Sequence, residues 1–137
     1  MSHLVYLLDT NILSDLIKHP NGLVAQKLME LKDDAVCCTS IIVASELQYG
    51  ATKKGSSKLT ERVQQLLGTI RILPLEIGVD ISYGFIRSSL EKVGTPIGGN
   101  DLFIAAHALS LNLIMVTANE KEFTRVEGLI VENWLDA

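Results

Sequence analysis

The chain has 137 residues, of which 47% are hydrophobic, and its formal net charge is −4. This length fits a single domain, residues 1–137, with a core of its own, and the apolar content excludes a disordered protein. No apolar stretch reaches the roughly 18–20 residues that a membrane helix needs, and the N-terminus does not resemble a secretory signal, so we expect no membrane partner.

The first half of the chain alternates short apolar runs with helical patterns. In chain order we predict a strand at 4–8, helices at 12–18 and 23–31, a strand at 35–38, a helix from about 40 to 49, a polar turn at 53–57 and a helix at 59–67. Residues 4–8 are apolar throughout, as in a parallel strand that is buried on both faces. Thr39 or Ser40 is expected to cap the helix that follows the second strand.

The second half repeats the alternation. We predict a strand at 71–73, a helix at 77–93, a loop at 94–99, a helix at 102–111 capped by Asn100, a strand at 113–116 and a last strand at 129–131. Strands and helices that alternate at these spacings indicate an α/β fold, in which a central, mostly parallel sheet is covered by helices on both faces.

Two adjacent cysteines, Cys37 and Cys38, indicate the compartment. Neighbouring side chains on a strand point to opposite faces of the sheet, so a disulfide between these two is not expected. Two buried free thiols fit a reducing cytoplasm better than they fit a redox or metal site.

Carboxylates recur where an ionised side chain is costly or unexpected. Asp9 directly follows the first predicted strand, and Asp101 lies in the first turn of a helix after two glycines. Each has a structural alternative, because Asp9 is also suited to cap a helix and Asp101 to interact with a helix dipole. Ligands of parallel sheets bind beyond the carboxyl ends of the strands, where both Asp9 and Asn119 are expected.

Glu46 shares a helix face with the apolar residues Ile42 and Val43. An ionised glutamate there costs several kcal/mol unless it is paired with a lysine or arginine or bound to a metal. We favour the metal, and oxygen ligands alone favour Mg²⁺ or Mn²⁺. The acids together predict a metal-dependent enzyme that acts on phosphate esters, with RNA as the preferred substrate. His107 is expected to be structural.

The charge balance argues against nucleic-acid binding, because phosphate contacts favour a basic surface. Bound cations would neutralise part of the acidic charge. Four cationic side chains also lie close together in the sequence: Lys53, Lys54, Lys58 and Arg62. They form either a solvated helix face or an RNA-binding groove.

Several motifs together resemble a PIN domain, specifically a VapC-type toxin ribonuclease. The motifs are residues 7–11, Thr39-Ser40 followed by Glu46, residues 94–101, residues 104–108, Thr117-Ala118-Asn119 leading to Glu122-Phe123, and the terminal residues 131–134. The resemblance spans nearly the whole chain and implies a three-layer α/β/α sandwich. It also implies cleavage of RNA such as tRNA or ribosomal RNA, inhibition by a cognate VapB-type antitoxin, and a homodimer within a larger toxin–antitoxin complex.

The resemblance assigns roles to individual residues. Asp9, Glu46 and Asp101 match the three core metal-site acids, and Glu122 is the best match to the variable fourth position, with Glu120 as the alternative. Orienting roles around these acids fall to Thr10, Asn11, Ser40, Thr117 and Asn119.

Other readings of the same residues are open. A phosphatase of the haloacid dehalogenase type also has an aspartate after its first strand but needs a second one two positions later, where this chain has Asn11. A signalling receiver needs a different arrangement of acids. The remaining alternative is a degenerate PIN domain that binds protein or RNA without catalysis.

Overall fold

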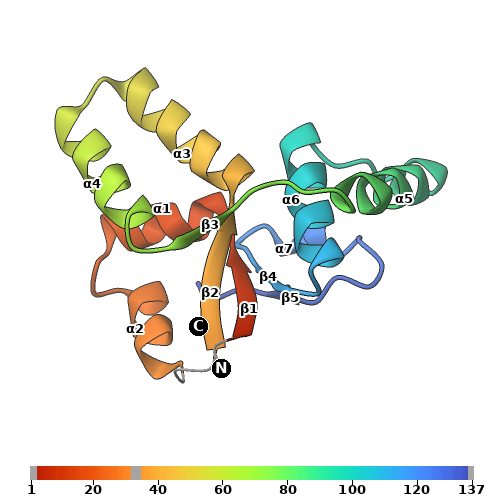
Figure 1. The fold of residues 1–137 in the computed structure, drawn as a ribbon, viewed down its shortest axis with the longest axis horizontal. Helices are drawn as coiled ribbons and strands as arrows, with labels where there is room; N and C mark the ends of the chain where they lie inside the picture. Colours follow the sequence, from red (N-terminus) through yellow and green to blue (C-terminus); the bar gives the residue numbers. More distant parts are fainter. Residues whose placement is uncertain (1–2, 32–34, 136–137) are drawn as a thin grey trace.

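The computed structural model describes residues 3–31 and 35–135, and these residues form a parallel sheet between two layers of helices (Figure 1). The strand order in the sheet is β3-β2-β1-β4-β5, and every pairing is parallel. The strands are β1 (His3–Leu8), β2 (Ala35–Ser40), β3 (Arg71–Leu73), β4 (Ile114–Val116) and β5 (Val131–Glu132). The predicted three-layer α/β/α architecture is confirmed.

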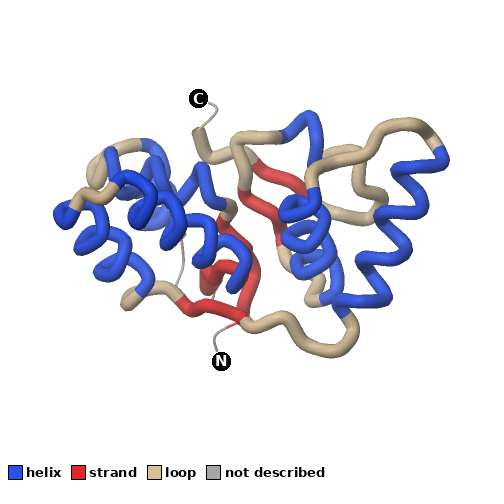
Figure 2. Tube along the Cα trace, turned by 90° about the horizontal axis from the view of Figure 1, so that it is seen from above, coloured by secondary structure: helices blue, strands red, loops and turns tan. Residues whose placement is uncertain are grey.

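The helices divide between the two faces of the sheet (Figure 2). Those of the first layer are α1 (Thr10–Lys18), α2 (Leu23–Glu30), α3 (Ile41–Lys54) and α4 (Ser57–Leu67). Those of the second are α5 (Val79–Lys92), α6 (Gly99–Ser110) and the short α7 (Glu120–Phe123). The apolar core includes Leu7 and Leu8 of β1, Ile104 of α6 and Met115 of β4, all of which are almost fully buried.

The chain order places a topological switch between β1 and β4. From β1 the chain adds β2 and then β3 on one side, and it then returns to add β4 and β5 on the other side of β1. Because parallel crossovers are right-handed, this reversal puts the connecting helices on opposite faces of the sheet. A crevice opens at such a point beyond the carboxyl ends of the two strands.

Most predicted elements lie within two residues of the observed ones, and the larger differences have local causes. The predicted cap Asn100 is wrong, because α6 begins at Gly99 with Gly98 at the N-cap. The predicted helix end near residue 49 is wrong, because α3 continues through Gly50 to Lys54. The predicted turn at 53–57 is present but shorter, since only Gly55, whose φ is 67°, and Ser56 separate α3 from α4. A left-handed glycine is a common helix terminator.

The last predicted strand is displaced, since β5 occupies Val131–Glu132 rather than residues 129–131. The sequence patterns also missed α7, which has only four residues. Both elements are too short for a hydrophobic period to develop.

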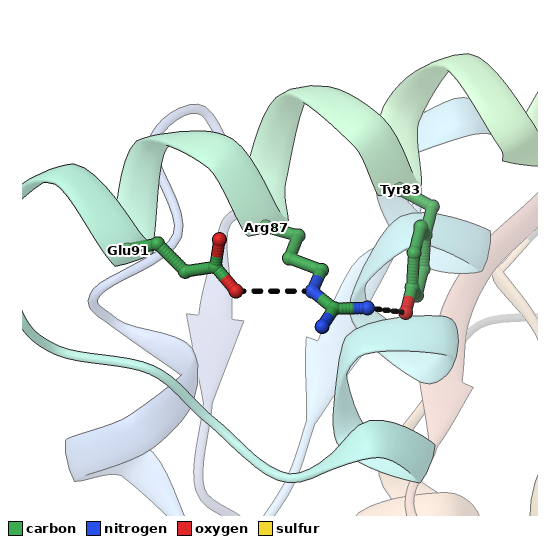
Figure 3. Close-up of polar contacts among 3 residues, drawn as sticks. All are labelled: Tyr83, Arg87 and Glu91. Carbon is green, nitrogen blue, oxygen red and sulfur yellow. Dashed lines mark hydrogen bonds and ion pairs between the residues drawn. The ribbon is translucent and has the colours of Figure 1, made fainter.

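The second helical layer is joined by side-chain contacts between α5 and α6. The rings of Tyr83 and Phe103 stack with their centroids 4.5 Å apart. On α5, Arg87 donates hydrogen bonds to the Tyr83 hydroxyl at 3.0 Å and to Glu91 at 3.1 Å (Figure 3). Arg87 lies four positions from each of the other two residues, a spacing at which helical side chains meet.

Both cysteines are free thiols, as predicted, but only Cys38 is buried, while Cys37 is partly exposed. Burial raises the pKa of Cys37 to about 11 and that of Cys38 to about 12, so both thiols stay protonated and unreactive near neutral pH. Within residues 3–31 and 35–135, no helix is both long enough and apolar enough to cross a membrane.

Candidate metal centre at the carboxyl end of the sheet

Asp9 lies directly after β1 and is 4% exposed. Its backbone N–H donates to the carbonyl of Val116 at 2.9 Å, which holds it beside the end of β4. One carboxylate oxygen, Oδ1, accepts the backbone N–H of Thr10 at 2.8 Å, and the other, Oδ2, accepts the hydroxyl of Thr117 at 2.7 Å. Asp9 therefore caps α1 and also lines the crevice at the topological switch.

Opposing influences act on the Asp9 carboxyl. Burial raises its pKa above the ordinary value, and the negative charge of Glu46 adds to this effect. The hydrogen bonds from Thr117 and Thr10 lower the pKa, because they stabilise the ionised form. Burial is the largest of these causes, so the net direction is upward.

Glu46 reaches the same crevice from α3. Its Oε1 accepts the Thr10 hydroxyl at 2.5 Å, and its Oε2 lies 3.4 Å from the side-chain amide of Asn100. Within the described residues Glu46 has no ion pair with a lysine or arginine, so nothing there supports the salt-bridge alternative. Thr10 thus touches two acids, since its backbone donates to Asp9 and its hydroxyl to Glu46.

Asp101, in the first turn of α6, shows the strongest electrostatic effect of the site. Its pKa is raised to about 7, first by burial, then by a hydrogen bond with the Glu122 carboxyl, and further by the charges of Asp9, Glu122 and Glu46. A hydrogen bond between two carboxyls requires one of them to be protonated. With a pKa of about 7, the Asp101 carboxyl is protonated in about half of the molecules at neutral pH while no cation is present.

The polar residues around these acids differ in what they contact. The Thr117 hydroxyl links the Asp9 carboxylate to the backbone N–H of Asn119, which it accepts at 3.0 Å. Asn11 accepts the backbone N–H of Ala118 at 3.1 Å and so joins the start of α1 to the loop after β4. Glu120 lies on α7 beside Glu122, and both are partly exposed.

Ser40 contacts none of the four acids. Its hydroxyl oxygen accepts the backbone N–H of Ile42 at 3.1 Å as the N-cap of α3, and it lies 2.8 Å from Nδ1 of His107 on α6. Burial lowers the pKa of His107, which favours the neutral imidazole. The pair ties together the two helices that carry Glu46 and Asp101, so His107 is structural, as predicted.

An open cleft of about 540 Å³ contains the candidate site. Its lining includes Asp9, Glu46, Asp101 and Asn119, whereas Glu122 contacts Asp101 from outside the lining. The lining also includes residues that the sequence patterns did not assign to the site: Ser14, Asp15, Lys18, His19 and Leu135. Four of these five lie on or next to α1, where a helical repeat starting from Asn11 would have identified Ser14, Asp15 and Lys18.

The donor set fits a hard divalent cation. Among the described residues, no three acidic, histidine or cysteine side chains close around a single point. Mg²⁺, however, keeps several water ligands and is usually bound through only one or two carboxylates. Burial and the neighbouring carboxylates together raise the pKa of Asp101 to about 7, and a cation between the carboxylates would offset both the lost hydration and the repulsion.

Comparisons with known proteins identify the family. A family model described as the PIN domain matches residues 6–129. The chain belongs to the PIN-domain family. This PIN domain is 38% identical over 133 residues to Ribonuclease VapC2 of Rickettsia felis, with 96% of this chain and 98% of the relative covered. It is 36% identical over 135 residues to the tRNA(fMet)-specific endonuclease VapC of Shigella flexneri, again with 96% and 98% covered.

Solved structures agree with this assignment. The PIN domain superposes with a TM-score of 0.89 on a chain in the crystal structure of VapBC2 from Rickettsia felis bound to a DNA fragment from their promoter. The two chains are 37% identical, and 95% of this chain and 98% of that chain are covered. Membership of the PIN-domain family rules out the haloacid dehalogenase and receiver alternatives.

Proposed function

We propose that this PIN domain is a metal-dependent endoribonuclease that hydrolyses phosphodiester bonds in RNA, and that Asp9, Glu46, Asp101 and Glu122 bind the metal. The observation that carries the proposal is the convergence of Asp9, Glu46 and Asp101 on one cleft, where burial and the neighbouring acids raise the pKa of Asp101 to about 7. The names of the relatives from Rickettsia felis and Shigella flexneri, both nucleases, favour catalysis over a degenerate binding module.

In this proposal the threonines orient the acids, and the acids supply the negative charge that binds the metal. Thr117 and Thr10 fix both oxygens of Asp9, and the Thr10 hydroxyl holds Glu46 beside it. The proton of the Asp101–Glu122 pair leaves when a cation compensates their charge. When bound, Mg²⁺ or Mn²⁺ offsets charge on the phosphoryl oxygens and makes water a stronger nucleophile. We assign the fourth position to Glu122 rather than Glu120, because Glu122 interacts with Asp101.

The comparisons also support a substrate class and a partner. We take tRNA or ribosomal RNA as the substrate, with tRNA favoured by the name of the Shigella flexneri relative. A cognate VapB-type antitoxin is the expected inhibitor, since the similar structure is a VapBC complex. We further propose that residues 1–137 form one domain that acts in the cytoplasm as a homodimer within a larger toxin–antitoxin complex.

The test is cleavage of total tRNA and ribosomal RNA by the purified, antitoxin-free protein, with Mg²⁺ and with EDTA. Discrete cuts that require Mg²⁺ and that disappear in Asp9→Asn are expected. Asp15→Asn is the matched control, because Asp15 lines the same cleft but is not one of the proposed metal ligands. Folded wild-type protein that neither cuts RNA nor binds Mn²⁺ in calorimetry would establish the degenerate module instead.

A further inference from the structure

Positive charge gathers where α3 turns into α4. Between residues 49 and 62 the chain has four of its 12 lysines and arginines, Lys53, Lys54, Lys58 and Arg62, against one acid, Glu61. All four cations are exposed. In a chain with a net charge of −4, this segment has a local excess of positive charge, and the field of such an excess attracts polyanions.

The cations do not all belong to one surface. Arg62 lines a groove between α1 and α4 with Leu16, Ile17 and Pro20, whereas Lys53 and Lys54 lie in the last turn of α3. Cations at a helix C-terminus interact favourably with the helix dipole, which gives both lysines a structural explanation.

The dipole does not account for the aromatic residue beside these lysines. Tyr49 is 65% exposed, and the Nζ atom of Lys53 lies 5.8 Å from the centroid of its ring. An exposed aromatic ring next to a cation is the combination with which proteins bind single-stranded nucleic acid, through stacking on a base and contact with a phosphate.

The same side of α3 leads to the candidate metal centre. Tyr49 and Lys53 follow Glu46 by three and seven positions, so they lie on its side of the helix. The opposite side is buried and includes Ala44 and Ala51. Seven residues of α-helix advance about 10 Å, which is about three nucleotide steps of a duplex strand. Figure 1 shows α3 running from the carboxyl end of β2 to this turn.

We propose that Tyr49, Lys53 and Lys54, here called the α3 track, bind the RNA substrate a few nucleotides from the bond that is cut. The lysines contact phosphates, and the ring of Tyr49 stacks on an unpaired base. This inference rests on the proposed function, and it assigns to the track the positioning of RNA rather than the chemistry.

The first experiment measures binding of fluorescently labelled total tRNA by anisotropy, with all variants in the Asp9→Asn background so that the RNA is not cut. The logarithm of the affinity falls linearly with the logarithm of the salt concentration. In the double variant Lys53→Ala/Lys54→Ala this slope should be shallower by about 1.4–1.8, because two phosphate contacts are lost. Lys53→Arg/Lys54→Arg should restore the slope. Lys92→Ala is the control, since Lys92 is an exposed lysine in the last turn of α5 on the other face of the sheet.

The second experiment separates stacking from charge. Tyr49→Ala should weaken RNA binding by about tenfold, while Tyr49→Phe should retain the affinity, because a phenylalanine ring stacks equally well. With active protein, the same track variants should raise KM and leave kcat and Mn²⁺ affinity unchanged.

The outcomes distinguish the two proposals. If the wild-type protein shows no Mg²⁺-dependent cleavage of RNA, the proposed function is overturned. If the wild type cuts RNA but the lysine and tyrosine variants bind with unchanged affinity and salt dependence, the α3 track is not the RNA surface, and an acidic protein partner becomes its occupant.

Discussion

Replacing Asp101 by asparagine should stabilise the metal-free protein and at the same time abolish its nuclease activity. The Asp101 carboxyl lies beside Glu122 and within the field of Asp9 and Glu46, and its pKa is raised to about 7. Ionising this group near neutral pH therefore destabilises the folded protein. Asparagine has nearly the same shape, carries no charge and can donate its amide to Glu122.

The magnitude follows from the pKa values of the folded and unfolded states. A rise from 3.8 to about 7 corresponds to about 4 kcal/mol, at about 1.4 kcal/mol per pKa unit. Asp101 is only partly buried, so screening by solvent reduces this to about 1–2 kcal/mol. For a chain of this size, that is a rise in Tm of about 3–8 °C.

The pH dependence has a definite sign. Between about pH 4 and pH 7 the folded protein binds more protons at Asp101 than the unfolded chain does, so the stability contributed by this group falls as the pH rises. The advantage of Asp101→Asn should therefore be about 40% of its full value at pH 5 and almost complete at pH 8.

The assay is urea unfolding in EDTA at both pH values, followed by the same measurement with excess Mn²⁺. Without metal, Asp101→Asn should be the more stable protein at pH 8. With Mn²⁺ the order should reverse, because the wild type gains the free energy of metal binding. Glu127→Gln, at an exposed position, is the control for removal of a charge. Equal advantages of Asp101→Asn at pH 5 and pH 8, or none at pH 8, would refute the electrostatic reasoning.

Three further outcomes are expected. Asp9→Asn should lower cleavage at least 100-fold while circular dichroism stays unchanged, because the asparagine oxygen still caps α1; a loss of helix signal would mean that the cap fails. Mn²⁺ binding at pH 6 should release protons from the Asp101–Glu122 pair, which calorimetry detects as a binding heat that depends on the buffer. If Asp101→Asn shows the same buffer dependence, the protons do not come from this pair. Ser40→Ala should destabilise the fold by about 1–3 kcal/mol in urea, because it leaves His107 Nδ1 buried without a partner, and an unchanged midpoint would exclude that hydrogen bond.

The architecture could be predicted from the sequence because most strands are recognisable as short apolar runs. Residues 4–8 of β1 are an uninterrupted apolar run, and the alternation of such runs with helical periods is compatible with few folds. Helix ends were harder to predict. Gly50 lies inside α3, where packing of Leu47 and Ala51 outweighs the low helix propensity of glycine, and two glycines begin α6 where Asn100 was the better cap by local rules.

The sequence indicated which acids belong to the candidate site, but not the hydrogen bonds that connect them to their neighbours. Asp9 stands out because it follows an apolar strand, and Asp101 because it follows two glycines at the start of a helix. The hydrogen bond from Thr10 to Glu46 spans 36 positions and that from Thr117 to Asp9 spans 108, and no local pattern encodes which side chains meet at such separations. The α1 wall of the cleft, including Lys18, depends in the same way on how α1 packs beside the sheet.

The long sequence separations within the site bear on how the protein is made. Asp9 acquires its partner Thr117 only when β4 pairs with β1, and Asp101 meets Glu122 only when α7 is in place. Contacts of this kind form late in folding, since a large loop must close before they are made. A nascent chain still attached to its ribosome lacks these last elements for most of its synthesis. The four carboxylates therefore come together only when the chain is nearly finished, and the candidate site is incomplete during most of its synthesis.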